Sequence, residues 1–168
     1  NLVVDAVGCG VVAGRIVTPN LAFGIYLDDL SANCIVYGNV VVRAAYGLWS
    51  NAGRKHTIEN NVFAECRNQV CFSVPPHLHD DRVYAYATGN RVVRNVFSIP
   101  ADAGSNSPVT FHSDFGAFDD ADQRRRTVAA SDYNVVFDPA GGKSGLEEWL
   151  ELGFDTHSST ADPLFIDP

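Results

Sequence analysis

The segments Ile58–Phe63 (IENNVF) and Val92–Phe97 (VVRNVF) decide the fold, because each places an asparagine directly before a short apolar run. The same pairing occurs five times along the chain, at Asn1, Asn39, Asn61, Asn95 and Asn134. These asparagines are 38, 22, 34 and 39 residues apart. The shortest spacing fits one turn of a wide solenoid, and the others fit the same turn with 16, 12 and 17 inserted residues. A repeated unit with insertions is typical of a repeat protein.

The 22-residue unit predicts the architecture of one turn. It contains three short strand-like segments, Val40–Val42, Tyr46–Ser50 and His56–Glu59, and none of them is long enough to be a crossover helix. Three strands per turn predict a parallel β-helix, in which strands pair between successive rungs about 4.8 Å apart. The asparagines then stack at one turn, where we expect them to adopt a positive φ and to hydrogen-bond from rung to rung.

Several segments carry a family resemblance. Gly24–Asp29, Ile35–Asn39 and Thr57–Phe63 resemble the right-handed parallel β-helix repeat of the pectin-lyase-like superfamily. Ser131–Val135 and Ala161–Asp167 are similar to the tails of bacterial β-helix proteins from carbohydrate-degrading systems. The resemblance implies an all-β, right-handed parallel β-helix and a secreted or periplasmic location. It implies no single activity, because the superfamily contains lyases, hydrolases, epimerases and non-catalytic proteins.

The domain organisation follows from the same repeat. Residues 1–137 are expected to form about five rungs, with loop insertions near 74–86 and 98–128. Residues 138–168 are expected to form a C-terminal cap. Within this cap, a capping-box pattern from Ser144 to Glu147, followed by Leu146, Trp149, Leu150 and Leu152, predicts a short helix near 145–152 that covers the last rung.

Composition limits the partners. The net charge of −8 argues against nucleic acid, which requires basic patches, and weakens the case for a strongly anionic polysaccharide. No apolar run approaches the ~18 residues that span a membrane. Because the chain opens directly on a strand, we expect upstream rungs or a partner chain to cover this N-terminal sheet edge. The four cysteines show no metal-type spacing. Cys9, Cys34 and Cys66 lie in or beside strand segments and are interpreted mainly as small buried residues, with a disulfide as the alternative.

Strand alternation selects a candidate binding face. Aligning the strands near Gly24, Gly47, Gln69 and Pro108 places one outward column at Tyr26, Trp49, Cys71 and Thr110, and a second at Asp28, Asn51, Ser73 and His112. Aromatic rings beside polar groups suit a sugar, which stacks on a ring and hydrogen-bonds through its hydroxyls. An exposed Trp49 favours this interpretation over a merely solvated face, and Arg67 lies in the turn nearby.

The candidate catalytic groups are carboxylates. Asp28 and Asp29 are adjacent, and Asp114 from an insertion could face them, so the pattern suits glycoside hydrolysis by two carboxylates. An ordinary turn is the favoured explanation of the Asp-Asp pair, because Asp residues are common in the turn after a strand. The polygalacturonase branch of the superfamily has such a pair, but its Gly-His-Gly and Arg-Ile-Lys motifs are absent here.

Two alternatives to hydrolysis stay open. A polysaccharide lyase would need a basic residue, such as Lys55, His56, Arg67 or Arg94, together with calcium, and these residues are dispersed. A non-catalytic β-helix would bind a polysaccharide or serve a structural role. No resident cofactor or metal site is expected, because the His77-Leu78-His79 pattern beside Asp80 is a weak metal signal, and Arg124–Arg126 is interpreted as a solvated loop.

Overall fold

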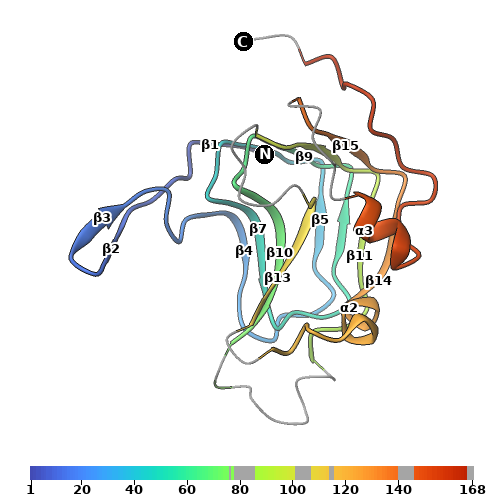
Figure 1. Ribbon diagram of the computed structural model, residues 1–168, viewed down its shortest axis with the longest axis horizontal. Helices are drawn as coiled ribbons and strands as arrows, with labels where there is room; N and C mark the ends of the chain where they lie inside the picture. The colour runs from blue at the N-terminus through green and yellow to red at the C-terminus, as the bar shows by residue number, and fades with distance from the viewer. Residues whose placement is uncertain (76, 78–85, 101–106, 114–115, 140–145, 166–168) are drawn as a thin grey trace.

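The strands of the computed structural model wind into three parallel sheets around one core (Figure 1). The structure describes residues 1–75, 77, 86–100, 107–113, 116–139 and 146–165. In spatial order the first sheet contains β1 (Leu2–Val4), β6 (Val40–Val42), β9 (Val62–Ala64), β12 (Val96–Ser98) and β15 (Val135–Phe137). The second sheet contains β4 (Phe23–Leu27), β7 (Tyr46–Asn51), β10 (Asn68–Val74) and β13 (Val109–Ser113). The third contains β5 (Ile35–Tyr37), β8 (Thr57–Glu59), β11 (Asn90–Val93) and β14 (Val128–Asp132).

Each of the first four rungs contributes one strand to each sheet and the last contributes β15 to the first sheet, which confirms the predicted all-β, right-handed parallel β-helix. Residues that share a register position stack into columns along the helix axis. In the first sheet, Val41, Phe63, Phe97 and Val136 occupy one fully buried column. Each such side chain contributes roughly 1.5–3 kcal/mol of burial free energy, so the core is a continuous apolar column that no single rung could form alone.

The predicted asparagine ladder is present at the turn before the first sheet. Asn1 Nδ2 donates to Asn39 Oδ1 at 2.8 Å, Asn39 to Asn61 at 2.9 Å, Asn61 to Asn95 at 3.0 Å and Asn95 to Asn134 at 3.3 Å. Where a positive φ was expected at these asparagines, the structure differs. The left-handed conformation falls on the residue before each of the last four asparagines, at Gly38, Asn60, Arg94 and Tyr133. The turn bends one residue earlier, which leaves each ladder amide free to point along the axis.

A second polar column, which the sequence did not reveal, lies at the turn before the third sheet. His56 Nδ1 accepts a hydrogen bond from the Cys34 N–H at 3.1 Å, and the His56 N–H donates to Asn90 Oδ1 at 3.0 Å. Asn90 Nδ2 then donates to the carbonyl of Thr127 at 3.0 Å. His56 is fully buried and serves as a link between rungs, as Asn90 does in the next rung.

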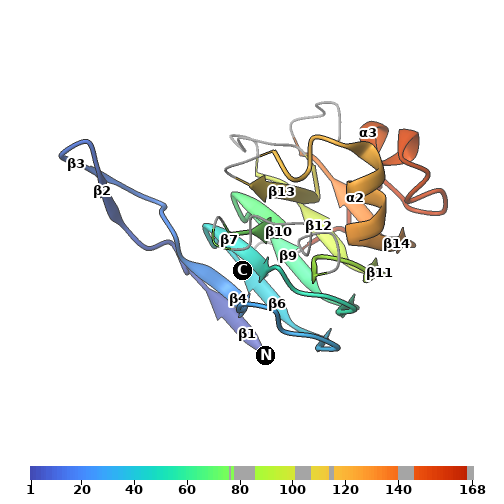
Figure 2. The same ribbon diagram turned by 90° about the horizontal axis from the view of Figure 1, so that it is seen from below.

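The first rung carries an insertion of its own. β2 (Gly10–Val12) and β3 (Arg15–Val17) pair antiparallel as a hairpin that projects away from the solenoid (Figures 1 and 2). Apolar side chains are exposed both on this hairpin and on the edge strands: Leu2, Val11, Ile16, Ile35 and Tyr37. Covering of this edge by upstream rungs or by a partner chain stays a prediction.

The rung-four insertion holds a helix where the sequence was interpreted as a solvated loop. α2 (Ala121–Thr127) begins after Asp120, whose side chain accepts from the Asp122 N–H at 2.9 Å, and its last turn carries Arg124–Arg126. A capping aspartate, an acidic first turn and a basic last turn suit a helix dipole. The charge run was therefore a helix signal, and the interpretation as a loop was wrong.

The C-terminal segment closes the last rung. α3 (Leu146–Glu151) buries Leu146 and Trp149, and Trp149 Nε1 donates to Ser107 Oγ at 2.9 Å, whereas Leu150 is exposed. Ser144, the expected capping residue, lies outside the described part of the chain. Beyond the helix, the buried Asp155 carboxylate ends the asparagine ladder by accepting from Asn134 Nδ2 at 2.7 Å.

All four cysteines are free thiols. Cys66 is buried as expected, and Cys71 is buried although strand alternation placed it outward; burial raises their pKa values to about 11 and about 12. Cys34 is partly exposed. The expectation of a buried residue is wrong for Cys9, which is exposed because it lies in the segment leading to the projecting hairpin.

Candidate functional site

The outer face of the second sheet has the register that was predicted by aligning the strands of successive rungs with one another. Tyr26 pairs with Trp49, Trp49 with Cys71, and Cys71 with Thr110. In the neighbouring column, Asn51 pairs with Ser73 and Ser73 with His112. Asp28 follows directly after β4, which ends at Leu27, so its side chain stands at the rim of the sheet.

A hollow of about 240 Å³ lies over this face. Its walls come from four strands, β4, β7, β10 and β13, and from the strap that returns from the hairpin, residues 18–22. The lining residues are Leu21, Phe23, Tyr26, Trp49, Asn51, Ser73, Val74, Pro75 and His112. The Phe23 and Tyr26 rings stack with centroids 4.8 Å apart, and Trp49 and His112 lie 5.4 Å apart. The hollow is therefore an aromatic surface bordered by amide, hydroxyl and imidazole groups.

Trp49 does not present the exposed ring that was expected. Its side chain is 8% exposed, because Tyr46 packs edge-on at 4.7 Å and Phe23 at 5.3 Å. Cys71 is also buried, a small side chain between Trp49 and Thr110. Tyr26, at 45% exposure, is the accessible ring of this face, and Trp49 supports it from within.

A break in strand alternation explains the residues that sequence analysis missed. A Cβ on Gly24 would lie 2.4 Å from Val41 Cγ1, and one on Gly47 would lie 2.7 Å from Phe63 Cδ1, so both glycines face the core. Ile25 and Leu48, the next residues, face the core as well. Because two consecutive residues of a strand face inward, the residue before them faces outward. This places Phe23, Tyr46 and their register partner Asn68 on the outer face. The paired glycines were the available signal, since Gly inside a strand often marks such an irregularity.

Hydrogen bonds connect the polar residues across the rungs. Ser73 Oγ donates to Asn51 Oδ1 at 2.8 Å. Asn51 Nδ2 lies 3.4 Å from the Tyr26 hydroxyl and also donates to Asp29 Oδ1. On its other side, Asp29 Oδ2 is 3.3 Å from His77 Nε2, which comes from the insertion after β10. Asp29 therefore swings back toward the face and joins two rungs to the insertion.

Asp28 is held in its ionised form. The Asp29 N–H, which donates to Asp28 Oδ1 at 2.8 Å, lowers the pKa of the Asp28 carboxyl, and the Tyr26 hydroxyl adds to this effect. Burial raises the pKa of Tyr26, and so does its hydrogen bond to Asp28. A carboxylate with a lowered pKa can accept hydrogen bonds, act as a base or attack as a nucleophile, whereas a general acid needs a raised pKa.

The remaining candidate residues do not add to the described lining of this hollow. Asp114, and likewise His79 and Asp80, lie outside the described residues. Arg67 lines a different hollow, near the start of β10. Of the other bases considered for lyase chemistry, His56 is buried, and Arg94 pairs with Glu59 at 2.8 Å on the third-sheet side. Among described residues, the hollow beside Tyr26 therefore has no arginine or lysine lining.

Fold and face together define a parallel β-helix protein with an aromatic and polar outer face. Residues 2–113, more than half of the chain, match the family model described as periplasmic copper-binding protein (NosD), and the chain belongs to this family. The family is a right-handed β-helix family within the pectin-lyase-like superfamily, so that part of the resemblance is confirmed. Comparisons with curated proteins and with solved structures gave no match.

The periplasmic description confirms the expected secreted or periplasmic location. Across the part of the chain that the structure describes, no helix is both long enough and apolar enough to cross a membrane.

The copper-binding description was tested against the side chains. Soft or imidazole ligands in a group suit copper. Within the described ranges, no three His, Cys, Asp or Glu side chains come together in a way that could hold a metal ion. His77 and Asp29 form one pair, and Cys66 and Cys71 are buried thiols with raised pKa values. The described residues thus do not fit a copper centre, and no chemistry is assigned through one.

Proposed function

We propose that the hollow on the outer face of the second sheet binds a saccharide. The observation that carries this proposal is the accessible Tyr26 ring, stacked on Phe23 and bordered by the hydrogen-bonded Asn51 and Ser73. An apolar ring with a few fixed polar groups matches a sugar, which has an apolar C–H face and hydroxyls around its edge. Because the polar groups stand on paired strands, they are already in position before the ligand arrives.

The carboxylates extend this binding surface. Asp28, ionised because of its hydrogen bonds from Asp29 and Tyr26, is an acceptor for sugar hydroxyls at the rim. Charge-assisted hydrogen bonds of this kind are stronger than neutral ones. Asn51 offers its amide beside Asp28, and His112 forms the opposite side of the hollow. In this proposal the face holds one sugar ring against Tyr26 with its hydroxyls directed toward Asp28, Asn51 and Ser73.

Glycoside hydrolysis is the second candidate, and the paired carboxylates favour it. The lowered pKa of Asp28 suits the base or nucleophile. The acid would then be Asp29, which already contacts His77, or Asp114. A lyase reaction that uses calcium is less favoured, because the hollow has no arginine or lysine lining among the described residues.

A panel of polysaccharides and oligosaccharides tests both candidates. Binding is measured by calorimetry, hydrolysis by new reducing ends, and lyase action by ultraviolet absorbance of unsaturated products. Tyr26→Ala is the diagnostic variant, and Tyr37→Ala is the matched control, because Tyr37 is an exposed tyrosine on the third sheet. We expect binding without bond cleavage, weakened about tenfold, or ~1.4 kcal/mol, by Tyr26→Ala and unchanged by Tyr37→Ala.

Two results would reject parts of this proposal. If no saccharide binds, or if Tyr26→Ala binds as tightly as Tyr37→Ala, the face is not a saccharide site. If the wild type releases reducing ends and Asp28→Asn or Asp29→Asn does not, the function of this hollow is hydrolysis and not simple binding.

A further inference from the structure

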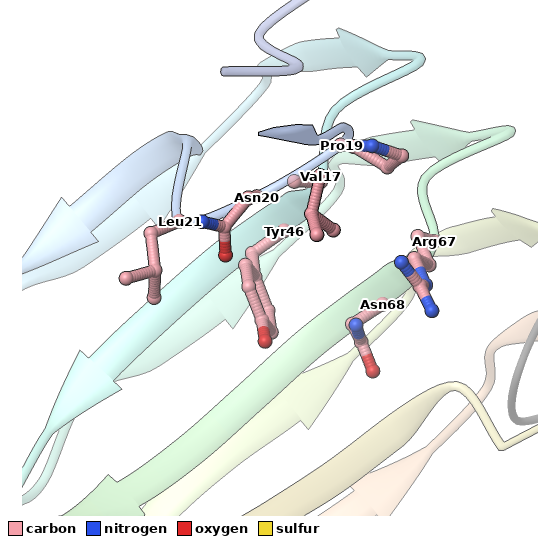
Figure 3. A pocket seen from close by; sticks show the side chains of 8 residues that line it. Val17, Pro19, Asn20, Leu21, Tyr46, Arg67 and Asn68 are labelled. Carbon is pink, nitrogen blue, oxygen red and sulfur yellow. The ribbon is translucent and has the colours of Figure 1, made fainter. Parts of the chain in front are cut away.

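A second hollow, of about 330 Å³, lies at the opposite end of the second sheet. It is formed between the strap that returns from the hairpin and the starts of β7 and β10. Figure 3 shows the side chains that line it, which include Val17, Asn20, Leu21, Tyr46, Arg67 and Asn68. Neither the family description nor the saccharide proposal accounts for this hollow.

The backbone fixes the polar members of this hollow. Tyr46 and Asn68 are register partners on adjacent rungs, and the break in alternation turns both outward. The Arg67 N–H donates to the carbonyl of Ala44 at 3.0 Å, and the Asn68 N–H donates to that of Ala45 at 3.2 Å. The side chains of Arg67 and Asn68 therefore start from a rigid base beside Tyr46 (Figure 3).

Arg67 gives this hollow a positive charge, whereas the net charge of the protein is negative. Arg43, Arg94 and Arg125 each pair with a carboxylate, at 2.7, 2.8 and 3.0 Å. Arg67 is exposed, and within the described ranges no carboxylate forms an ion pair with its guanidinium. Burial raises the pKa of Tyr46, and the positive charge of Arg67 offsets part of that rise. The Arg67 guanidinium, the Asn68 amide and the Tyr46 phenol offer hydrogen-bond donors around one space, which suits an anionic oxygen group, whereas Asn20 turns its Nδ2 toward Gly10.

The two hollows are parts of one surface. Leu21 lines both of them. The rings of Tyr46, Phe23 and Tyr26 follow one another between them, with centroids 5.5 and 4.8 Å apart. β7 runs from Tyr46 to Asn51, which corresponds to about 16 Å of strand. A ligand that reaches from Arg67 to Asp28 is thus an oligosaccharide and not a single sugar.

We propose that the Arg67 hollow is the subsite for one acidic group of the bound saccharide. This inference rests on the saccharide proposal and specifies its ligand. Asp28 and Asp29 at the other hollow repel a second anionic group, and so does the net charge of −8. The preferred ligand therefore carries a single carboxylate or sulfate at the Arg67 end and is neutral at the Asp28 end. A uniformly charged polyuronate can place one carboxylate at Arg67, but Asp28 and Asp29 repel its carboxylates at the hollow beside Tyr26.

Calorimetry with matched probes tests this inference. The probes are pairs of tetrasaccharides of xylan, glucan and galactan type, each pair comprising a neutral member and a member with one terminal uronate. Carboxyl-reduced and sulfated analogues, together with polygalacturonate, complete the set. The variants are Arg67→Ala, and Arg91→Ala as the control, because Arg91 is an exposed arginine on the third sheet.

We expect the monoacidic member of a pair to bind about tenfold more tightly than the neutral member at low salt, with a smaller preference at high salt. Arg67→Ala should remove the preference and keep the neutral affinity, and Arg91→Ala should change neither. A sulfated analogue that binds like the uronate shows that the subsite recognises anionic charge, and one that binds like the neutral probe shows that it recognises a carboxylate.

The outcomes separate this inference from the saccharide proposal. If neutral probes bind but Arg67→Ala leaves the acidic preference intact, or if polygalacturonate binds best, the Arg67 subsite is overturned and the saccharide face stands. If no probe binds at all, the saccharide face itself is wrong.

Discussion

At the scale of single residues, the asparagine ladder does more than mark the repeat. Asn61 Oδ1 accepts from both the backbone N–H and the side-chain amide of Asn39, at 3.0 and 2.9 Å, and Asn61 Nδ2 donates to the carbonyl of Val36 at 2.9 Å. These groups are buried, so water cannot replace the side chain if it is removed.

Asn61→Ala should therefore lower the free energy of unfolding by about 3 kcal/mol, because each buried group left without a partner costs ~1–3 kcal/mol. Asn1→Ala is the matched control. Asn1 is exposed and donates only one side-chain hydrogen bond within the ladder, so its loss should cost less than about 1 kcal/mol. Urea unfolding of the two variants measures both losses of unfolding free energy. If Asn61→Ala loses as little as Asn1→Ala, the ladder does not stabilise the solenoid.

His56 is a neutral link inside the protein. Its Nδ1 accepts from Cys34 N–H, which requires that nitrogen to be unprotonated, and Nε2 lies 3.3 Å from Ser31 Oγ. Burial lowers the pKa of His56 below 6.5. The unfolded chain then binds a proton at a higher pH than the folded chain does. The stabilising contribution of His56 is complete above pH ~6.5 and is lost as the pH falls toward the lowered pKa.

We predict that the wild type loses unfolding free energy more steeply than His56→Asn as the pH falls below ~6.5. Asparagine fits this column, because Asn90 occupies the equivalent place in the next rung. Chemical unfolding at a series of pH values gives the two slopes. Parallel slopes would mean that His56 titrates alike in the folded and unfolded states.

These residues also show what the sequence could and could not reveal. The ladder was predictable, because five asparagines share an apolar neighbour. The column that links Cys34, His56 and Asn90 was not, because the side chains that accept its inter-rung bonds are of two different types, an imidazole and an amide. Trp49 was expected at the surface because strict alternation placed it outward, and the rings that cover it became visible only with the inward turn at Gly47.

At the scale of elements, the insertions decide which surface is available for binding. The strand order of the three sheets follows from the repeat, so the register of Tyr26, Trp49, Asn51 and Ser73 could be aligned in advance. α2 was missed, because its Asp and Arg residues were interpreted as a solvated loop. The position of Arg67 beside the returning strap depends on how the hairpin insertion folds back, which no local pattern specifies.

The C-terminal segment closes the ladder with a buried carboxylate. Asp155 accepts from Asn134 Nδ2 at 2.7 Å and from Ser131 Oγ at 2.6 Å, so it occupies the place of a sixth ladder residue. Asp155→Ala should lower the free energy of unfolding by roughly 3 kcal/mol, since it leaves these donors buried and unpaired. Asp162→Ala, at an exposed aspartate of the same segment, should have almost no effect. If both variants unfold at the wild-type urea concentration, the closing role of Asp155 is wrong.

At the scale of the whole molecule, the C-terminal segment covers the last rung of the solenoid. Asp155, α3 and the segment between them cover the last rung, whereas Ile35 remains 76% exposed on the first. The outer face of the second sheet is bordered by the strap that returns from the hairpin and, beside Asp29, by His77. This arrangement gives a rigid sheet with walls, and it is the whole-molecule basis for proposing a saccharide site there.

Tryptophan fluorescence gives the most direct test of where a saccharide binds, because the chain has only two tryptophans. Trp149→Phe leaves Trp49, which lines the hollow beside Tyr26, and Trp49→Phe leaves Trp149, which is buried on α3 in the C-terminal segment. Titration of each variant with the tightest-binding saccharide should produce a saturable change in Trp49 emission, with the same affinity as calorimetry, and no change in Trp149 emission. Calorimetric binding with an unchanged Trp49 signal would place the ligand elsewhere and contradict the account.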